Sequence, residues 1–307
     1  MAGFRMKLHV PLSAFIAMIY IAMSFIIAPQ PAEAKSKPRK IKTSAIELRA
    51  IKDSSVDVFD VLAHIPKADT AFAQGNYALA LQHYRYVYLH DPKQDHVAMG
   101  YADAALALGQ TAIAKKIYKD FAITNNRAKS GLLLTCVLEK TLKDPEVKLR
   151  AQLETASDDA RLWNMLGQIL DANERGSEAR QAYAMAQLAG QRAGLASNNI
   201  GQSFLKEQNL EAALREFTQA SFDAPQNRLF DNNRRLTLLL QKDYIQALRQ
   251  LDKSRASQLL KDAGLIVARQ GETKLAKYFL EKSIWLNPVY DESAAQYLEQ
   301  LSGRLSQ

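Results

Sequence analysis

The chain has 307 residues, 48% of them hydrophobic, and a formal net charge of +8. Cys136 is its one cysteine, which excludes an intramolecular disulfide. The sequence has no phosphate-binding glycine-rich loop, no His-Glu-x-x-His and no Gly-x-Ser-x-Gly. It therefore gives no reason to expect an enzyme, a metal site or a cofactor.

The N-terminus has the pattern of a secretory signal. Basic residues at 5 and 7 precede an uncharged apolar run over 10–28, and the small residues Ala32 and Ala34 supply a cleavage site. We expect residues 1–34 to be a signal peptide and the cleaved protein to be periplasmic. The apolar run is also about long enough to span a bilayer, so the alternative is an uncleaved inner-membrane anchor that leaves the protein facing the periplasm.

The next segment, residues 35–58, is polar, basic and weakly patterned, and we expect it to be flexible. A basic segment can bind nucleic acid, an anionic membrane or cell-wall polymers. For an exported protein we expect membrane or cell-wall contact and no nucleic acid. The alternative is a solvated linker.

From residue 59 onward the apolar residues recur with the period of helices and not of strands. Two consecutive stretches, 160–193 and 194–227, share one frame of 34 residues in which small residues alternate with large apolar ones. Small residues let two antiparallel helices approach closely, and the large ones fill the space around the contact. The residues that share this frame are Trp163, Leu166, Gly167, Leu170, Ala179, Tyr183 and Ala186, then Ile200, Gly201, Phe204, Ala213, Phe217, Ala220 and Pro225.

This spacing resembles that of the tetratricopeptide repeat (TPR). The resemblance implies an all-α fold, a solenoid in which antiparallel helix pairs form a right-handed superhelix. We expect the solenoid to span 59–304, with units near 61–94, 95–128, 129–159, 160–193, 194–227, 228–256 and 257–290 and a cap at 291–304.

Three of these stretches are irregular. In the degenerate unit 129–159, Cys136 takes a small-residue position, where we expect it to be buried, but Thr135 and Glu139 replace large apolar residues. The unit that begins at 228 is short, so its second helix or turn must be shortened. The stretch 291–304 is amphipathic and predicts a C-terminal capping helix with Gly303 as its stop signal.

Amide side chains recur on the first helices of the repeats, which line the groove in TPR arrays. Asn164, Asn198 and Asn232 take the same position in three units. Because a primary amide both donates and accepts hydrogen bonds, such a row can hold the backbone of an extended protein segment. The alternative for Asn199 and Asn233 is that they brace their own turns. The full predicted partner-binding groove comprises Asn164, Gln168, Asn198, Asn199, Gln202, Asn232, Asn233, Arg234 and Arg235, with the two arginines suited to an acidic part of the partner.

Residues 160–290 also resemble the TadD-type TPR proteins of tight-adherence (Flp) pilus assembly. The resemblance rests on the two well-formed repeats, the Asn-Asn-Arg-Arg-Leu run at 232–236 and the Asn287-Pro288 ending of the last unit. It implies a role in pilus biogenesis. Proteins of that family are usually lipoproteins that act on the outer-membrane secretin, and this sequence departs from them in having no lipid-attachment cysteine.

Three functions follow from these features. The first is an exported TPR scaffold for assembly of a cell-envelope machine, the Tad/Flp pilus. Its expected partners are proteins of the pilus or secretion machinery. The second is a membrane-anchored TPR protein that organises cell-wall or division components. The third, an enzyme with hidden chemistry, has no residue to support it.

Overall fold

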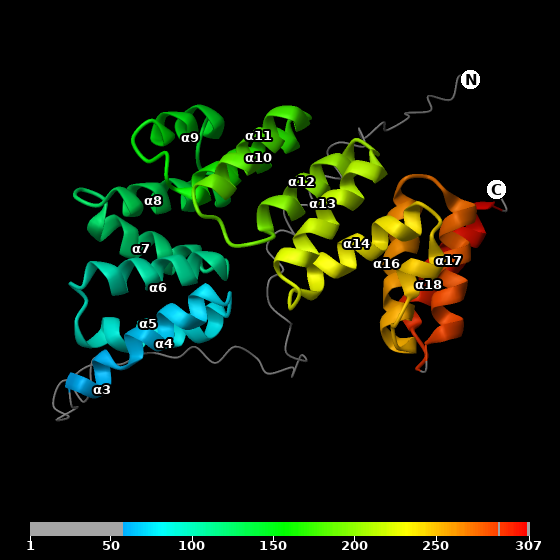
Figure 1. Ribbon diagram of the computed structural model, residues 1–307, viewed down its shortest axis with the longest axis horizontal. Helices are drawn as coiled ribbons and strands as arrows, with labels where there is room; N and C mark the ends of the chain where they lie inside the picture. The colour runs from blue at the N-terminus through cyan, green and yellow to red at the C-terminus, as the bar shows by residue number, and fades with distance from the viewer. Residues whose placement is uncertain (1–57, 288, 306–307) are drawn as a thin grey trace, which may run out of the picture. The chain divides into compact units, whose positions relative to one another are not determined.

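The structure is a computed structural model that describes residues 58–287 and 289–305. The expected signal at 1–34 and nearly all of the basic segment at 35–58 lie outside the described residues. Within the described part every regular element is a helix (Figure 1), which confirms the all-α repeat fold. None of the described helices is both long and apolar enough to cross a membrane.

The described part of the chain divides into two compact units, 58–175 and 176–305. In the first, consecutive helices pack in pairs along the chain, α4 with α5, α6 with α7, and α9 with α10. Its helices are α3 (Val58–Leu62), α4 (His64–Ala73), α5 (Tyr77–His90), α6 (Asp95–Ala107), α7 (Thr111–Phe121), α8 (Asn126–Leu138), α9 (Pro145–Leu153) and α10 (Ala160–Ala172).

The second unit follows the same plan and ends in a single helix. α12 packs on α11 and α13, α14 packs on α13 and α16, and α17 lies between α16 and α18. Its helices are α11 (Gly176–Leu188), α12 (Leu195–Lys206), α13 (Leu210–Asp223), α14 (Arg228–Leu240), α15 (Tyr244–Leu248), α16 (Lys253–Arg269), α17 (Thr273–Leu286) and α18 (Glu292–Leu305).

The turn inside a helix pair is built from two local signals. After α4, Gly75 has φ +77°, a left-handed conformation that costs glycine little, and its N–H donates to the Phe72 carbonyl. The next N–H, of Asn76, donates to Ala71, which completes a Schellman ending. The Asn76 side chain then accepts a hydrogen bond from the Leu79 N–H at 3.2 Å and caps α5. One short sequence thus ends one helix and starts its partner.

The predicted small-residue contacts hold the pairs together. The alanine at the same position of six units is fully buried, with 0% of its surface exposed in Ala80, Ala114, Ala179, Ala213, Ala247 and Ala276. The glycine position is equally tight, because a Cβ on Gly201 would lie 2.9 Å from the Phe217 ring. The helices therefore touch where the sequence frame placed the small residues.

The degenerate unit differs from the sequence frame. Its first helix, α8, begins at Asn126 and not near 129, because α7 has 11 residues where the equivalent α5 has 14. The close contact then falls on Gly131, where a Cβ would lie 2.3 Å from the Tyr118 ring. Cys136 is only half-buried, so its assignment to the packed position was wrong.

The structure shows how the short unit that begins at 228 and the predicted cap at 291–304 are built. The second helix of the unit at 228 is α15, which has five residues. The cap α18 runs from Glu292 through Gly303 to Leu305, so Gly303 does not end the helix as expected.

Candidate functional site

The predicted amide groove is, in the second unit, a cluster of hydrogen-bonded side chains on α12 and α14. Asn198 is 2% exposed and Asn233 is 8% exposed, and the Asn233 amide donates to the Asn198 carbonyl oxygen at 2.7 Å. The Asn198 amide in turn donates to Asn199 at 3.3 Å. Gln202, one turn further along α12, is buried beside them. These amides connect the first helices of two successive repeats.

The three repeated asparagines differ in exposure, so they do not face a partner as one uniform row. Asn198 is buried against the next repeat because α12 and α14 are neighbours, so its amide meets the residue 35 positions later. Asn232 is exposed. Asn164 and Gln168 are half-buried on α10, which belongs to the first unit. Whether these side chains bind a partner's backbone stays a prediction.

The two predicted arginines share one carboxylate. Arg234 donates to one oxygen of Asp231 and Arg235 to the other, both at 2.7 Å. Burial raises the pKa of Asp231, but the hydrogen bonds from both arginines outweigh it and lower the pKa below its ordinary value. Arg235 also donates to the Ala247 and Arg249 carbonyls at 2.8 and 2.9 Å. Its guanidinium is therefore committed to holding the end of α15.

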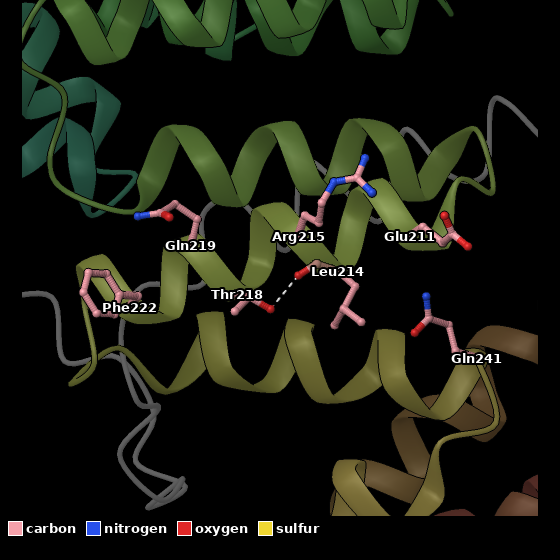
Figure 2. Close-up of a pocket in the computed structure, with 7 residues that line it drawn as sticks. All are labelled: Glu211, Leu214, Arg215, Thr218, Gln219, Phe222 and Gln241. Carbon is pink, nitrogen blue, oxygen red and sulfur yellow. Dashed lines mark hydrogen bonds between the residues drawn. The ribbon is translucent and has the colours of Figure 1, made fainter.

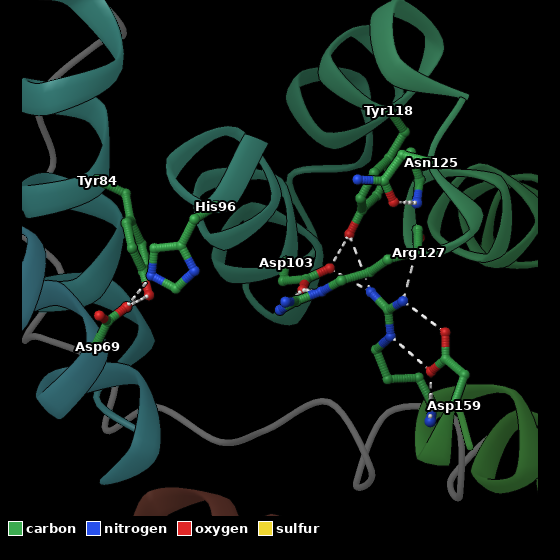
Figure 3. A network of polar contacts seen from close by, with 10 residues as sticks. Asp69, Tyr84, His96, Asp103, Tyr118, Asn125, Arg127 and Asp159 are labelled. Atoms are coloured by element: carbon green, nitrogen blue, oxygen red, sulfur yellow. Dashed lines mark hydrogen bonds and ion pairs between the residues drawn. The ribbon is translucent and has the colours of Figure 1, made fainter. Parts of the chain in front are cut away.

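A second polar cluster, which the sequence analysis missed, lies in the first unit around Asp103 (Figure 3). This carboxylate, on α6, has a side chain only 3% exposed and accepts hydrogen bonds from the Tyr118 hydroxyl and from Arg127 and Arg161. Burial first, and then the neighbouring Asp103 charge, raise the pKa of Tyr118 well above its ordinary value. A buried carboxylate with two guanidinium partners is a structural junction of α6, α7, α8 and α10.

Arg161 extends this cluster to the cap of α10. Its guanidinium donates to both oxygens of Asp159, at 2.6 and 2.9 Å, and to the Arg127 carbonyl at 3.2 Å. Burial opposes the charge of Asp159, but the hydrogen bonds from Arg161 prevail and lower its pKa. The Arg161 N–H is itself capped by Asp159 at 3.1 Å, so one carboxylate starts the helix and orients its first arginine.

A smaller copy of the cluster lies one repeat earlier. Asp69 accepts from the Tyr84 hydroxyl and from His96 at 2.8 Å. The aspartate and the tyrosine are 15 residues apart in both copies, and the copies are 34 residues apart. That double spacing was the sequence signal that could have revealed the network.

Comparison with known proteins connects these features to a family. Residues 71–123 match the model of the tetratricopeptide repeat. The described helices also pack in the pairs that this repeat forms. The chain is a tetratricopeptide repeat protein. Proteins of this kind are usually not catalytic and act by binding other proteins.

Solved structures similar to this TPR protein are distant in sequence. A chain of the APC/C hetero-tetramer Cut9–Hcn1 matches with a TM-score of 0.58 and 14% identity over 85% of this chain. This chain spans 53% of the length of that one. A thermophilic TPR protein from Thermus thermophilus matches with a TM-score of 0.49 and 18% identity, over 58% of this chain and 99% of its own. No curated protein sequence matches the chain.

The TPR protein also has an open pocket of about 750 Å³ on α13 that sequence reasoning did not find (Figure 2). Leu214, Thr218 and Phe222 recur every four residues and so share one face of the helix. Thr218 donates its hydroxyl to the Leu214 carbonyl at 2.7 Å. The other lining residues are Glu211, Arg215, Gln219 and Gln241.

Two histidines of the TPR protein contact each other. His64 and His83 are joined by a 2.8 Å contact between their Nδ1 atoms, and His90 donates from Nδ1 to the Tyr86 carbonyl. Burial first, and then His83, lower the pKa of His64. Among the described residues no group of three His, Cys, Asp or Glu is arranged to hold a metal ion.

Proposed function

We propose that this TPR protein is an exported scaffold that binds protein partners during assembly of a cell-envelope machine, the Tad/Flp pilus. As a TPR protein it is a scaffold for protein–protein interaction. The export, the machine and the identity of the partners are the proposed part. They rest on the N-terminal signal pattern and on the TadD-type resemblance of 160–290.

The observation that carries the binding role is the polar face shared by α12 and α14. Asn198, Asn199, Gln202 and Asn233 are all buried there, and helix packing does not require an amide at the position of Asn198. Buried amides are costly unless hydrogen-bonded. The Asn198–Asn233 hydrogen bond fixes the amides in place, and the exposed Asn232 lies beside them in the sequence. We propose that the buried amides hold α12 and α14 in register and that a partner's extended backbone binds at the exposed Asn232.

The proposed location can be tested apart from the binding role. A fusion of residues 1–60 to a reporter that is active only outside the cytoplasm should be active. An inactive fusion would contradict export. Mass analysis of the purified native protein then distinguishes a chain that begins at Lys35 from one that retains the apolar run at 10–28.

The long apolar run supports one alternative function. An uncleaved segment of that length would anchor the protein in the inner membrane, where its repeats would organise cell-wall or division components. Deletion of the gene separates the two proposals. Loss of Flp pili with normal cell shape supports pilus assembly, whereas normal piliation with altered shape or septa supports the alternative.

A further inference from the structure

We propose that the pocket-lining face of α13 and the turn that follows it bind an acidic peptide segment of a protein partner, at a site separate from the amide face of α12 and α14. The site joins two pockets. The 750 Å³ pocket on α13 shares Thr218 and Phe222 with a second pocket of about 500 Å³. The remaining residues of the second pocket are Ser221, Pro225, Gln226, Asn227, Arg228, Asp231, Arg234 and Arg255.

The apolar part of the site combines an exposed ring, Phe222, with the half-buried side chain of Leu214. Phe222 is 80% exposed at the end of α13, and Leu214 lies two turns before it on the same face. Packing an apolar side chain on this exposed ring removes apolar surface from water, which gives a favourable free energy of binding. A leucine-sized side chain of the partner fits this chemistry.

The charged part of the site favours a carboxylate. Three arginines line the second pocket against one acid, Asp231, and that acid is already bound to Arg234 and Arg235. Within the described part of the chain, the exposed guanidiniums of Arg228 and Arg255 have no ion-pair partner. A guanidinium binds a carboxylate through two parallel hydrogen bonds. The pocket therefore has positive charge left for an aspartate or glutamate of the partner.

Two further features favour a peptide over a nucleic acid or a membrane. The Gln241 amide, in the first pocket, can both donate to and accept from a peptide backbone. Glu211 places negative charge in the first pocket, which repels a continuous row of phosphates. Ser221 lines the second pocket, and its buried hydroxyl has no hydrogen-bond partner among the described residues, so it can donate to a ligand.

The test uses the full chain and a displayed library of random peptides. Selection on the wild type should enrich peptides in which one or two apolar residues lie next to an aspartate or glutamate. A selected peptide, labelled with a fluorophore, then gives the Kd for wild type and variants. The same peptide with asparagine or glutamine in place of its acidic residues should bind about tenfold more weakly.

Two variants test the two parts of the site. Arg228→Gln with Arg255→Gln should raise the Kd about tenfold, and Phe222→Ala should weaken binding while leaving the fold intact, because that ring is already exposed. The matched control is Arg85→Gln with Arg249→Gln, which removes the same charge from exposed arginines outside both pockets.

Several results would overturn the proposal. One is a selection that enriches no peptide, or only peptides without an acidic residue. Another is an unchanged Kd for the pocket variants. The third is an equal rise in Kd for the control pair, which would indicate nonspecific attraction between the basic protein and the acidic peptide. Binding of the wild type to anionic vesicles or single-stranded DNA that the same pocket variants abolish would assign the site to another ligand. Because the asparagines of α12 and α14 are unchanged throughout, a negative result here leaves the proposed amide face untouched.

Discussion

Gly201 lies where α12 and α13 come closest, and the 2.9 Å between an added Cβ and the Phe217 ring leaves no room for a side chain. The same is true of Gly100 and Gly131, where a Cβ would lie within 2.4 and 2.3 Å of Tyr84 and Tyr118. At the scale of residues, the repeats depend on such single positions because one extra methyl group forces two helices apart.

Gly201→Leu should therefore lower the free energy of unfolding by about 1–3 kcal/mol or more, which is the usual cost of overpacking a filled contact. Urea denaturation measures the loss. The control is Gly176→Ala, whose added Cβ would meet mainly the flexible end of the Glu207 side chain, so its effect should stay within about 0.5 kcal/mol. Equal stability of wild type and Gly201→Leu would place Gly201 outside the contact.

The buried cluster around Asp103 gives a second prediction at this scale. Asp103→Asn removes the buried carboxylate charge that two guanidiniums share and should cost about 2 kcal/mol of unfolding free energy, because hydrogen bonds to a charged group are stronger than neutral ones. Tyr118→Phe removes one hydroxyl from the same carboxylate and should cost about 1 kcal/mol. If urea denaturation shows the same loss of unfolding free energy for both variants, the ion pairs of Asp103 add no stability beyond its hydrogen bond with the Tyr118 hydroxyl.

The sequence predicted packing positions better than polar contacts. The buried alanines follow from the 34-residue frame alone, because each contact repeats within its own helix pair. The Asp103–Arg161 pair joins residues 58 positions apart, and no local spacing marks such a pair. The 34-residue period revealed the row of asparagines. It could not show that Asn198 bonds to Asn233 on the next repeat, because that residue lies one position beyond the period.

At the scale of elements, the short helix α15 depends on a neighbour. Its five residues are too few to form a stable helix alone. Asp243 caps its start by accepting from the Gln246 N–H at 3.1 Å, and Arg235 on α14 donates to carbonyls at its end. The helix is therefore held from both ends by side chains outside it.

Arg235→Lys should loosen α15 selectively, since an ammonium keeps the charge but cannot bind Asp231 and two carbonyls in the fixed fork of a guanidinium. We expect faster hydrogen exchange in 244–252 with little change in α12 and α13. Peptide-resolved mass spectrometry measures both regions. Unchanged protection of 244–252 would show that α15 does not depend on Arg235.

The cap α18 is joined to α16 by a carboxylate with an unusual titration. A hydrogen bond from Lys261, at 2.7 Å, and another from Ser293 lower the pKa of Asp291 from 3.8 to about 2. Because the folded pKa is the lower one, this ion contributes full stability above about pH 4. The contribution is lost as the pH falls through about 2.

Wild type should accordingly be more stable than Asp291→Asn at neutral pH, and the difference should shrink between pH 4 and pH 2. Urea midpoints at a series of pH values measure it, and the comparison between the two chains removes the effect of other carboxylates. A difference in stability that stays constant between pH 4 and pH 2 would mean that folding does not lower the pKa of Asp291.

At the scale of the whole molecule, each compact unit contains its own cluster of polar side chains. The first contains the Asp103 cluster, in which every carboxylate is paired, and its role is to join repeats. The second contains the amide face of α12 and α14 and the pockets of α13. Partner binding is therefore expected to concentrate in residues 176–305.

The most direct measurement of the scaffold role is co-purification of the full chain from native envelopes, with every retained protein quantified by mass spectrometry. The wild type should retain pilus-assembly proteins in stoichiometric amount. Asn232→Ala, which spares the Asn198–Asn233 hydrogen bond, should stay folded and retain about tenfold less. A folded wild-type chain that retains no protein in stoichiometric amount would contradict the scaffold role.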